Sequence, residues 1–203
     1  MGTENELILA FRSRCKRYEN LGYDRLETPR IILNAAEING GRALDIGTGK
    51  GILAMELARR GCEVISVDLD KRERELAMAL TEEAGLSERI KFMQADAARL
   101  EFADEYFDCA GMMDVLHHLD NPQAVMSEMV RVVKSGGRLI IADFDEEGFA
   151  LLDRLHQEDG ATHDRAGVTV VEASEVLTAL GCRTIKTLNA GLHNITVLEK
   201  QVF

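Results

Sequence analysis

Glycine occupies every second position of the stretch Gly47-Thr48-Gly49-Lys50-Gly51. An apolar run at residues 42–46 precedes it, and residues 52–60 follow with apolar side chains at helical spacing. Because these glycines have no Cβ, the backbone can turn sharply there and approach a ligand closely. The first N–H groups of the following helix have no partner inside that helix and can bind a polar group. This pattern predicts a small-molecule cradle for a dinucleotide or an adenosyl sulfonium.

Two common phosphate-binding patterns do not fit this stretch. A dinucleotide site requires G-x-G-x-x-G, whose third glycine lets the helix pack closely on the strand. Here Gly51 comes one position early, and Ile52 stands where that pattern has glycine. The P-loop pattern is missing as well, because no Gly-Lys-Ser/Thr follows at the required distance. A nicotinamide dinucleotide is therefore disfavoured, although the glycines alone do not identify the ligand.

Strand and helix patterns alternate around the glycine stretch and would position it. Apolar runs predict strands over residues 42–46, 63–67, 90–93, 107–113 and 138–142. Helical spacing predicts helices over residues 52–60, 71–84, 122–134, 147–157 and 172–180. Five such alternations favour a doubly wound, mostly parallel α/β sheet. In such sheets ligands bind outside the carboxyl ends of the strands.

The N-terminal part adds helices to this core. Helical spacing over residues 4–20 and 29–38 predicts an N-terminal helical cap, residues 1–39. Thr28 followed by Pro29 fits a helix cap with proline at the first helical position.

The C-terminal part adds two strands. Residues 183–188 and 194–199 alternate weakly and are joined by a tight turn through Gly191, which predicts an antiparallel hairpin. The expected sheet thus has seven strands, and we expect one domain in which residues 40–203 form the α/β core.

Composition limits the possible partners. The net charge of −11 argues against nucleic acid, since binding proteins usually present a basic stripe to the phosphates. The four cysteines are scattered without CxxC spacing, which argues against a disulfide framework or a zinc site. No stretch reaches transmembrane length, and the N-terminus lacks a signal-peptide pattern. We expect a cytoplasmic protein that does not bind membranes; the oligomeric state is open, a homodimer included.

Several segments resemble the class I S-adenosylmethionine-dependent methyltransferases: LDIGTGKG, FDCAGMMDVLHHLDNP and VVKSGGRLIIADF. Acidic residues that close the second strand and follow the third strengthen the resemblance. It covers residues 41–144 and is closest to the small-molecule branch, which includes the ubiquinone/menaquinone C-methyltransferases. The resemblance implies a Rossmann-like methyltransferase fold, S-adenosylmethionine as methyl donor, S-adenosylhomocysteine as product and a small-molecule acceptor.

The resemblance also implies a cofactor site along the carboxyl ends of the first four strands. Asp45 would face the cationic amino end of the cofactor, although it could equally cap the glycine loop. Asp68 would accept hydrogen bonds from the ribose hydroxyls, as acidic residues do in dinucleotide folds too. Beyond it, Leu69 would flank the adenine, and Asp96 and the Ala97 N–H would bind the adenine edge. The predicted cofactor-binding residues are Asp45, Gly47, Thr48, Gly49, Gly51, Asp68, Leu69, Asp96, Ala97, Met113 and Asp114.

Topology predicts the acceptor site beside the cofactor. The ends of strands four and five and the turn before the last strand should meet at one mouth, which groups Asp114, His117, His118, Asp143, Asp145 and His193. The N-terminal helices would cover this mouth and bring Tyr18 or Tyr23 close. We predict His118 and His193 as catalytic acid/base residues and Asp143 as an orienting partner. Purely structural roles for both histidines stay open.

A metal site is not predicted. His156, His163 and His193, with Asp143 and Asp145, could supply ligands, but the gap between His156 and His163 is not a usual ligand spacing. The pair Glu158-Asp159 is interpreted as part of a solvated acidic face.

The favoured function is methyl transfer to a small molecule by in-line displacement. Proximity can supply most of the acceleration, because the cofactor carries an activated methyl group. A general base is needed only if the acceptor must lose a proton. The alternatives are an NAD(P)-dependent oxidoreductase, which Ile52 disfavours, and a protein that binds S-adenosylmethionine without transferring its methyl group.

Overall fold

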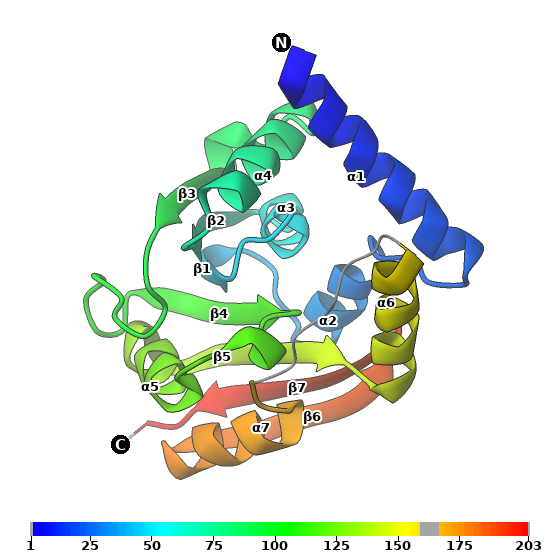
Figure 1. Cartoon of the computed structure of the whole chain (residues 1–203). Helices are drawn as coiled ribbons and strands as arrows, with labels where there is room; N and C mark the ends of the chain where they lie inside the picture. Colours follow the sequence, from blue (N-terminus) through cyan, green and yellow to red (C-terminus); the bar gives the residue numbers. More distant parts are fainter. Residues whose placement is uncertain (1, 159–166, 203) are drawn as a thin grey trace.

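The computed structural model describes residues 2–158 and 167–202, and one seven-stranded sheet runs through it (Figure 1). The strand order is β3-β2-β1-β4-β5-β7-β6. The strands are β1 Gly41–Ile46, β2 Cys62–Asp68, β3 Ile90–Gln94, β4 Phe107–Met113, β5 Val133–Phe144, β6 Cys182–Ala190 and β7 His193–Lys200. The pairs among β1 to β5 are parallel, whereas β7 is antiparallel to both β5 and β6. The predicted doubly wound sheet and C-terminal hairpin are confirmed.

Helices cover both faces of the sheet (Figure 1). They are α1 Gly2–Asn20, α2 Thr28–Ala35, α3 Ile52–Arg59, α4 Lys71–Glu83, α5 Pro122–Val132, α6 Glu146–Glu158 and α7 Val170–Ala179, with short 3-10 turns η1 Ser87–Arg89 and η2 Leu116–His118. One core cluster joins α2, α3 and α4 to the sheet, and the other joins α5 and α7 to it. Along β5, Ile140 belongs to the first cluster and its neighbours Leu139 and Ile141 to the second, as expected for a strand buried on both faces.

The N-terminal helices form the expected cap. The long helix α1 runs along one side of the molecule from α4 to α6 (Figure 1), and ion pairs Arg12–Glu83 and Arg17–Glu158 fasten it at these two places. At its end, the rings of Tyr18 and Tyr23 join a third apolar cluster with α6. This segment lies over the carboxyl ends of the central strands.

Two local predictions were wrong. The N-cap of α2 is Glu27, so Thr28 lies inside the helix and makes no capping hydrogen bond. Strand β5 begins at Val133, well before the predicted residue 138, because Val133 already pairs with Phe107 of β4. The register then shifts between Phe107 and Cys109, so the chain passes through the glycines of this segment without leaving the sheet.

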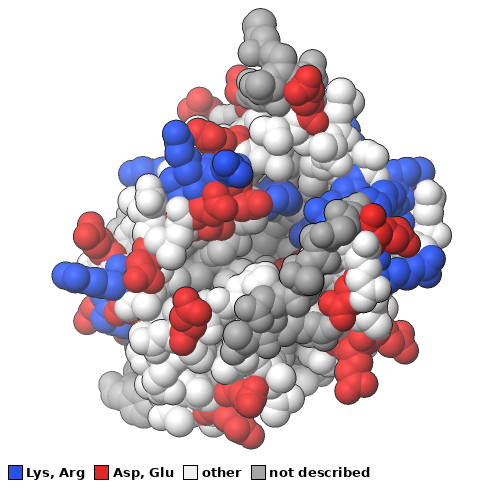
Figure 2. Space-filling model, in the orientation of Figure 1, with Lys and Arg blue, Asp and Glu red and all other residues white. Residues whose placement is uncertain are grey.

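Other features bear on the class of protein. All four cysteines are buried and free. Within residues 2–158 and 167–202, no helix combines the length and the apolarity that crossing a membrane requires. Acidic and basic side chains are interspersed over the face in Figure 2, which is hollowed near its centre.

Candidate functional site

The glycine loop, residues 47–51, leaves the carboxyl end of β1 and is held by the neighbouring strand. The N–H groups of Gly47 and Thr48 both donate to the carbonyl oxygen of Val67, at 2.9 and 3.2 Å. Gly47 has φ +80°, and a Cβ there would lie 2.3 Å from Cγ2 of Val115. A Cβ at Gly49 would meet nothing closer than 4.0 Å. Gly47 is therefore required by packing, whereas Gly49 leaves its side of the loop open to a ligand.

A buried chain of hydroxyls and a carboxyl supports this loop from below. The Ser66 hydroxyl donates to Oδ2 of Asp45 at 2.7 Å, so the Thr48 hydroxyl, 2.6 Å away, must donate to Ser66. Burial raises the pKa of Asp45 to about 7, even though the Ser66 hydrogen bond lowers it. Asp45 is thus linked to the loop through Ser66, a partner that the sequence did not predict.

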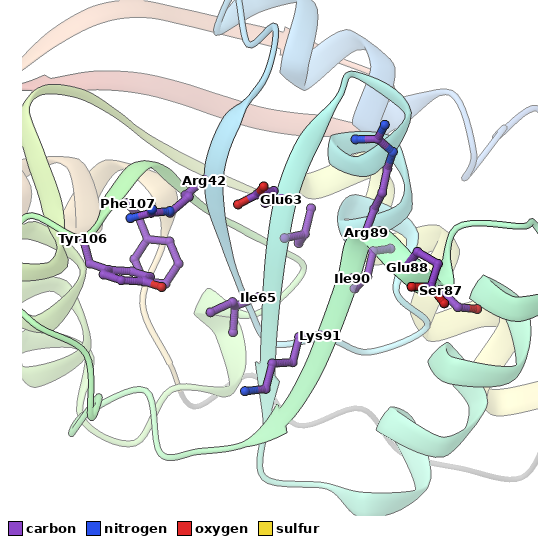
Figure 3. A pocket seen from close by; sticks show the side chains of 11 residues that line it. Arg42, Glu63, Ile65, Ser87, Glu88, Arg89, Ile90, Lys91, Tyr106 and Phe107 are labelled. Carbon is purple, nitrogen blue, oxygen red and sulfur yellow. The ribbon is translucent and has the colours of Figure 1, made fainter.

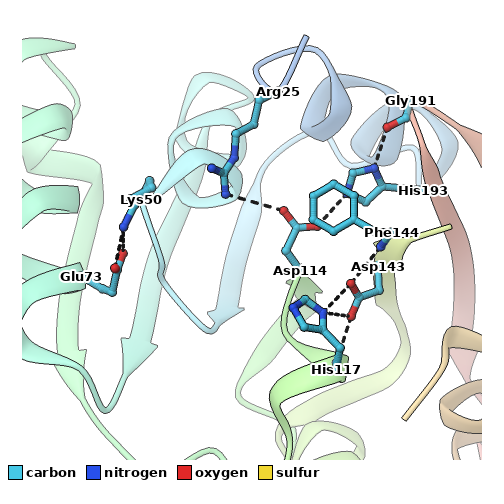
Figure 4. A network of polar contacts seen from close by, with 9 residues as sticks. All are labelled: Arg25, Lys50, Glu73, Asp114, His117, Asp143, Phe144, Gly191 and His193. Atoms are coloured by element: carbon cyan, nitrogen blue, oxygen red, sulfur yellow. Dashed lines mark hydrogen bonds and ion pairs between the residues drawn. The ribbon is translucent and has the colours of Figure 1, made fainter. Parts of the chain in front are cut away.

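The end of β2 meets the loop through Asp68. Its Oδ2 atom accepts from the Gly49 N–H at 3.1 Å, and Oδ1 accepts from the Asp70 N–H at 2.9 Å. Each carboxylate oxygen keeps lone-pair capacity after these bonds. Leu69 is 62% exposed beside it. Next to this site, Lys50 of the loop forms an ion pair with Glu73 of α4 (Figure 4).

The ends of β3 and β4 complete the row of predicted cofactor positions. Asp96 is exposed and accepts from the Ala98 N–H at 2.8 Å, and Ala97 is half-buried. Met113 is half-buried, while Met112 is fully buried in the core. The carboxyl ends of four adjacent strands therefore carry the predicted residues, and the cofactor roles of those residues stay predictions. For convenience, residues 45–51, 66–70 and 94–98 are called the cradle.

A group of buried and half-buried charged side chains lies at the ends of β4, β5 and β7 (Figure 4). We call it the ion cluster: Arg25, Asp114, His117, Asp143 and His193. His193 has both ring nitrogens 2.7 Å from acceptors, Nδ1 from the Gly191 carbonyl and Nε2 from Oδ1 of Asp114. Because neither acceptor carries a hydrogen to give, both nitrogens donate and the ring is an imidazolium.

The charges of the cluster support this assignment. Burial by itself lowers the pKa of His193, but the adjacent Asp114 carboxylate outweighs it and raises the pKa above its usual value. Burial alone would raise the pKa of Asp114, yet His193 and Arg25 hold it below its usual range. An Arg25 nitrogen lies 3.9 Å from Oδ2 of Asp114. Asp114 has φ +60°, a strained conformation for a residue with a side chain.

The predicted pairing of Asp143 was wrong. Asp143 accepts from Nδ1 of His117 at 2.7 Å and from the backbone N–H groups of His117 and Phe144, so its partner is neither His118 nor His193. His118 is exposed, and its ring lies 4.0 Å from that of His117. In η2 the first histidine of the pair points into the protein and the second points out. Catalytic roles for His118, His193 and Asp143 remain predictions.

Aromatic rings close this part of the site. The rings of Phe144 and Tyr23 lie 4.4 and 5.9 Å from that of His193, which has no exposed surface. Of the two tyrosines expected near the mouth, Tyr18 or Tyr23, Tyr23 is therefore the one that lies against His193. Asp145 lies beside it but is bound to the Gly148 N–H and the Asn189 amide.

The possible metal ligands do not form a described site. Within the described ranges, no group of three His, Cys, Asp or Glu side chains is placed to hold a metal ion. His163 and Asp159 lie outside these ranges, and Glu158 is paired with Arg17.

Sequence reasoning missed Arg25 and Ser66 and underrated His117. Arg25 lies between two predicted helices and pairs with a residue 89 positions away (114 − 25 = 89), so no local signal marks it. Ser66 is a small polar residue in the otherwise apolar run EVISV, which could have suggested a buried hydrogen bond.

A separate cavity of about 430 Å³ lies at the opposite edge of the sheet, among the amino ends of β1 to β4 (Figure 3). Here the Arg42 guanidinium lies 4.9 Å from the centre of the Tyr106 ring, and the Arg42 N–H donates to Asp108. Because ligands of doubly wound sheets bind at the carboxyl ends, this cavity is not part of the candidate site.

Comparisons with known proteins agree with this geometry. The sequence profile of a family described as "Methyltransferase domain" matches residues 44–141. The chain is 37% identical over 110 residues to methyltransferase GfsG of Streptomyces halstedii, covering 54% of this chain and 40% of that one. It is 31% identical over 121 residues to the ubiquinone/menaquinone biosynthesis C-methyltransferase UbiE of Pseudomonas paraeruginosa, covering 58% and 47%. The matched regions thus span less than half of each of these two relatives.

Solved structures show the same fold. A SAM-dependent methyltransferase from Methanosarcina mazei superposes with a TM-score of 0.67 at 22% identity, covering 85% of this chain and 98% of that one. At this identity the likeness concerns the fold alone.

Proposed function

We propose that the chain is a class I S-adenosylmethionine-dependent methyltransferase that binds S-adenosylmethionine in the cradle and transfers its methyl group to a small molecule. The observation that carries the proposal is the contact between Asp68 and the Gly49 N–H. It puts a carboxylate with spare lone pairs against a loop whose outer side is open. A ribose with two adjacent hydroxyls suits such a carboxylate.

The cradle fits an adenosyl cofactor in several ways. Gly49 allows close approach of a ligand to the backbone, and Asp68 and Asp96 supply acceptors for ribose hydroxyls and an adenine amino group. The exposed side chain of Leu69 can cover the adenine ring. Ile52 stands where a dinucleotide site has the glycine that lets its helix pack closely on the strand. NAD(P) therefore fits this site less well.

The residues of the site would mainly position and shield the reactants. Bound S-adenosylmethionine supplies an activated methyl group, so the chain has to align an acceptor and exclude water. Tyr23 and Phe144 close the ion cluster against solvent. His193 donates from both nitrogens and Asp114 stays ionised, so in this arrangement neither is a strong general base. Their role would instead be to hold a paired positive and negative charge next to the cradle.

The two curated relatives suggest the class of acceptor. Both are described as methyltransferases, and one is named for ubiquinone/menaquinone biosynthesis, which favours a small organic acceptor over a macromolecule. The net charge of −11 and the mixed surface in Figure 2 favour the same choice over nucleic acid.

The first experiment is calorimetric titration of the purified protein with S-adenosylhomocysteine, S-adenosylmethionine and NAD in parallel. We expect micromolar binding of both adenosyl ligands and none of NAD. Binding of NAD alone would overturn the proposal. If the adenosyl ligands bind, turnover with a panel of small acceptors separates an enzyme from a protein that only binds the cofactor.

A further inference from the structure

The segment between α1 and α2 carries polar side chains that face the ion cluster. Tyr23, Arg25 and Thr28 lie within six positions of each other, and the side chains of Tyr23 and Thr28 are 2% and 0% exposed. The charges of Asp114 and Arg25 both act on the Tyr23 hydroxyl, whose pKa burial raises. A Cβ at Gly191 would come within 3.1 Å of the Thr28 hydroxyl, which places that hydroxyl beside the turn that holds His193.

Four polar atoms in this place are buried without a hydrogen bond of normal geometry to the described residues, although the Thr28 hydroxyl lies close enough to that of Tyr23 to lower the Tyr23 pKa. They are the Tyr23 hydroxyl, Nε of Arg25, the Thr28 hydroxyl and Oδ2 of Asp114. An unpaired buried polar atom costs roughly 1–3 kcal/mol, so native proteins rarely gather several together without a purpose. We call the four residues that carry these atoms, Tyr23, Arg25, Thr28 and Asp114, the chamber.

The chemistry of the four atoms selects a ligand group. Asp114 Oδ2 only accepts, so the ligand must donate to it, and Arg25 Nε only donates, so the ligand must also accept. An ammonium cannot accept and a carboxylate cannot donate. A neutral amine beside the Asp114 carboxylate would take up a proton and become an ammonium. A hydroxyl both donates and accepts from one atom, and two hydroxyls of the protein complete its surroundings.

The chamber adjoins the cradle. Asp114 is followed by Val115, whose side chain packs directly against Gly47 of the glycine loop, because a Cβ at Gly47 would overlap it. A group bound at Asp114 would therefore lie close to the loop that we assign to the cofactor. The covering residues 21–27 make their backbone hydrogen bonds with residues 18–31, that is, within their own part of the chain.

We infer that Tyr23, Arg25, Thr28 and Asp114 form the acceptor subsite and that it takes a hydroxyl group, such as that of a phenol or enol. The inference rests on the proposed function, because it makes the chamber the acceptor side of the cradle. Tyr23, Arg25 and Thr28 would touch the acceptor through their polar atoms, and the ion pair of Asp114 with His193 would hold the accepting oxygen in place.

The test uses the full chain saturated with S-adenosylhomocysteine and follows its thermal midpoint with four probes. These are phenol, anisole, benzylamine and benzoate; anisole is phenol with its hydroxyl methylated and so lacks the donor. We expect phenol to raise Tm by about 2 °C or more and the other three to leave it unchanged. An equal or larger rise with anisole, benzylamine or benzoate would overturn the inference, and so would no rise with phenol.

Variants locate the effect. Thr28→Val and Tyr23→Phe remove hydroxyls that make no hydrogen bond of normal geometry, so both proteins should fold with thermal midpoints close to that of the unaltered chain. Each should lose at least half of the phenol-induced shift while binding S-adenosylhomocysteine normally. The matched control is Thr81→Val, which removes another buried, unpartnered hydroxyl on α4 and should keep the full shift. An unchanged phenol shift in both chamber variants contradicts the inference even if cofactor binding succeeds, whereas failure of S-adenosylhomocysteine to bind the unaltered chain refutes the proposed function itself.

Discussion

The cradle and the ion cluster lie at the same edge of one sheet but are built in opposite ways. The cradle uses backbone groups, three glycines and carboxylates that cap nearby N–H groups, and much of it is open to solvent. The ion cluster uses side chains from three strand ends and from the N-terminal cap, and it is closed by aromatic rings. Local geometry defines the first region, and long-range packing defines the second.

This difference fits two different tasks. A cofactor shared by a whole family can be bound by backbone geometry, which tolerates exchange of most side chains. An acceptor differs between enzymes, so its recognition falls to particular side chains in the second region. We therefore expect substitutions in the ion cluster to act mainly on stability and acceptor choice, and those in the cradle mainly on cofactor binding.

The largest effect should come from Asp114→Asn. The amide removes the one negative charge between Arg25 and His193 and leaves the half-buried Arg25 and the buried His193 without it. Breaking a buried ion pair in this way costs about 3–5 kcal/mol. The measurement is the free energy of unfolding in urea at several pH values.

The pH dependence of this loss has a definite sign. Because folding lowers the pKa of Asp114, this group stabilises the protein above its ordinary pKa of 3.8. Because folding raises the pKa of His193, the stability from this group is complete below its ordinary pKa of 6.5. That stability is lost as pH rises through the pKa of His193 in the folded protein. The difference between the two proteins should therefore be largest from about pH 4 to pH 6.5 and shrink above it. The control is Asp108→Asn near the other end of β4, where the ion pair with Lys134 is more than 40% exposed and should contribute at most about 1 kcal/mol. Equal losses of unfolding free energy in Asp114→Asn and Asp108→Asn would contradict the special role of the ion cluster.

The second prediction is that a steric clash in the cradle lowers the free energy of unfolding by a comparable amount. Gly47→Ala puts a Cβ against Val115 in a backbone with φ +80°, and we expect a cost of about 3 kcal/mol from strain and overlap. Gly61→Ala is the matched control, because its φ is +86° and its Cβ would meet nothing within 4 Å. Its loss should be the strain alone, about 1–2 kcal/mol. Urea unfolding of both variants separates packing from strain.

The third prediction concerns Asp45, the buried carboxyl group of the cradle. Its pKa of about 7 lies above the ordinary value of 3.8. Between pH 3.8 and pH 7, Asp45 therefore keeps its proton in the folded protein and loses it in the unfolded chain. Stability from this group is complete below pH 3.8 and is lost as pH rises through 7. Between pH 5 and pH 6.5 the unaltered chain should lose about 2 kcal/mol relative to Asp45→Asn, which has no proton to release. Parallel stability profiles for the two proteins would show that Asp45 is ionised throughout.

The same contrast explains what the sequence could and could not predict. The glycine loop, Asp68 and Asp96 belong to short contiguous patterns at strand ends, and the structure places them at the predicted edge. The meeting of Asp114 with His193 also followed from topology, because strand order brings those ends together.

The partners inside the cluster did not follow. Which histidine of His117-His118 points inward depends on the 3-10 turn η2, and apolar periodicity carries no information about such a turn. Arg25 lies in a connection between helices, where its direction depends on how the cap packs on the sheet. Thr28 was mistaken for a cap because a Thr-Pro pair has the same local pattern whether the helix starts at Thr28 or one residue earlier.

The smallest expected effect separates binding from folding within a single loop. Asp68→Ala removes the proposed ribose acceptor, and we expect about a ten-fold loss of S-adenosylhomocysteine affinity, about 1.4 kcal/mol, with circular dichroism unchanged. Asp70→Ala, two residues later, removes the cap that accepts from the Arg72 N–H at the start of α4. It should cost about 1 kcal/mol of stability and leave affinity within about two-fold. If Asp68→Ala instead unfolds the chain, the bond of Asp68 to the Gly49 N–H is structural. The cradle would then resemble the ion cluster in depending on a side chain more than on its backbone.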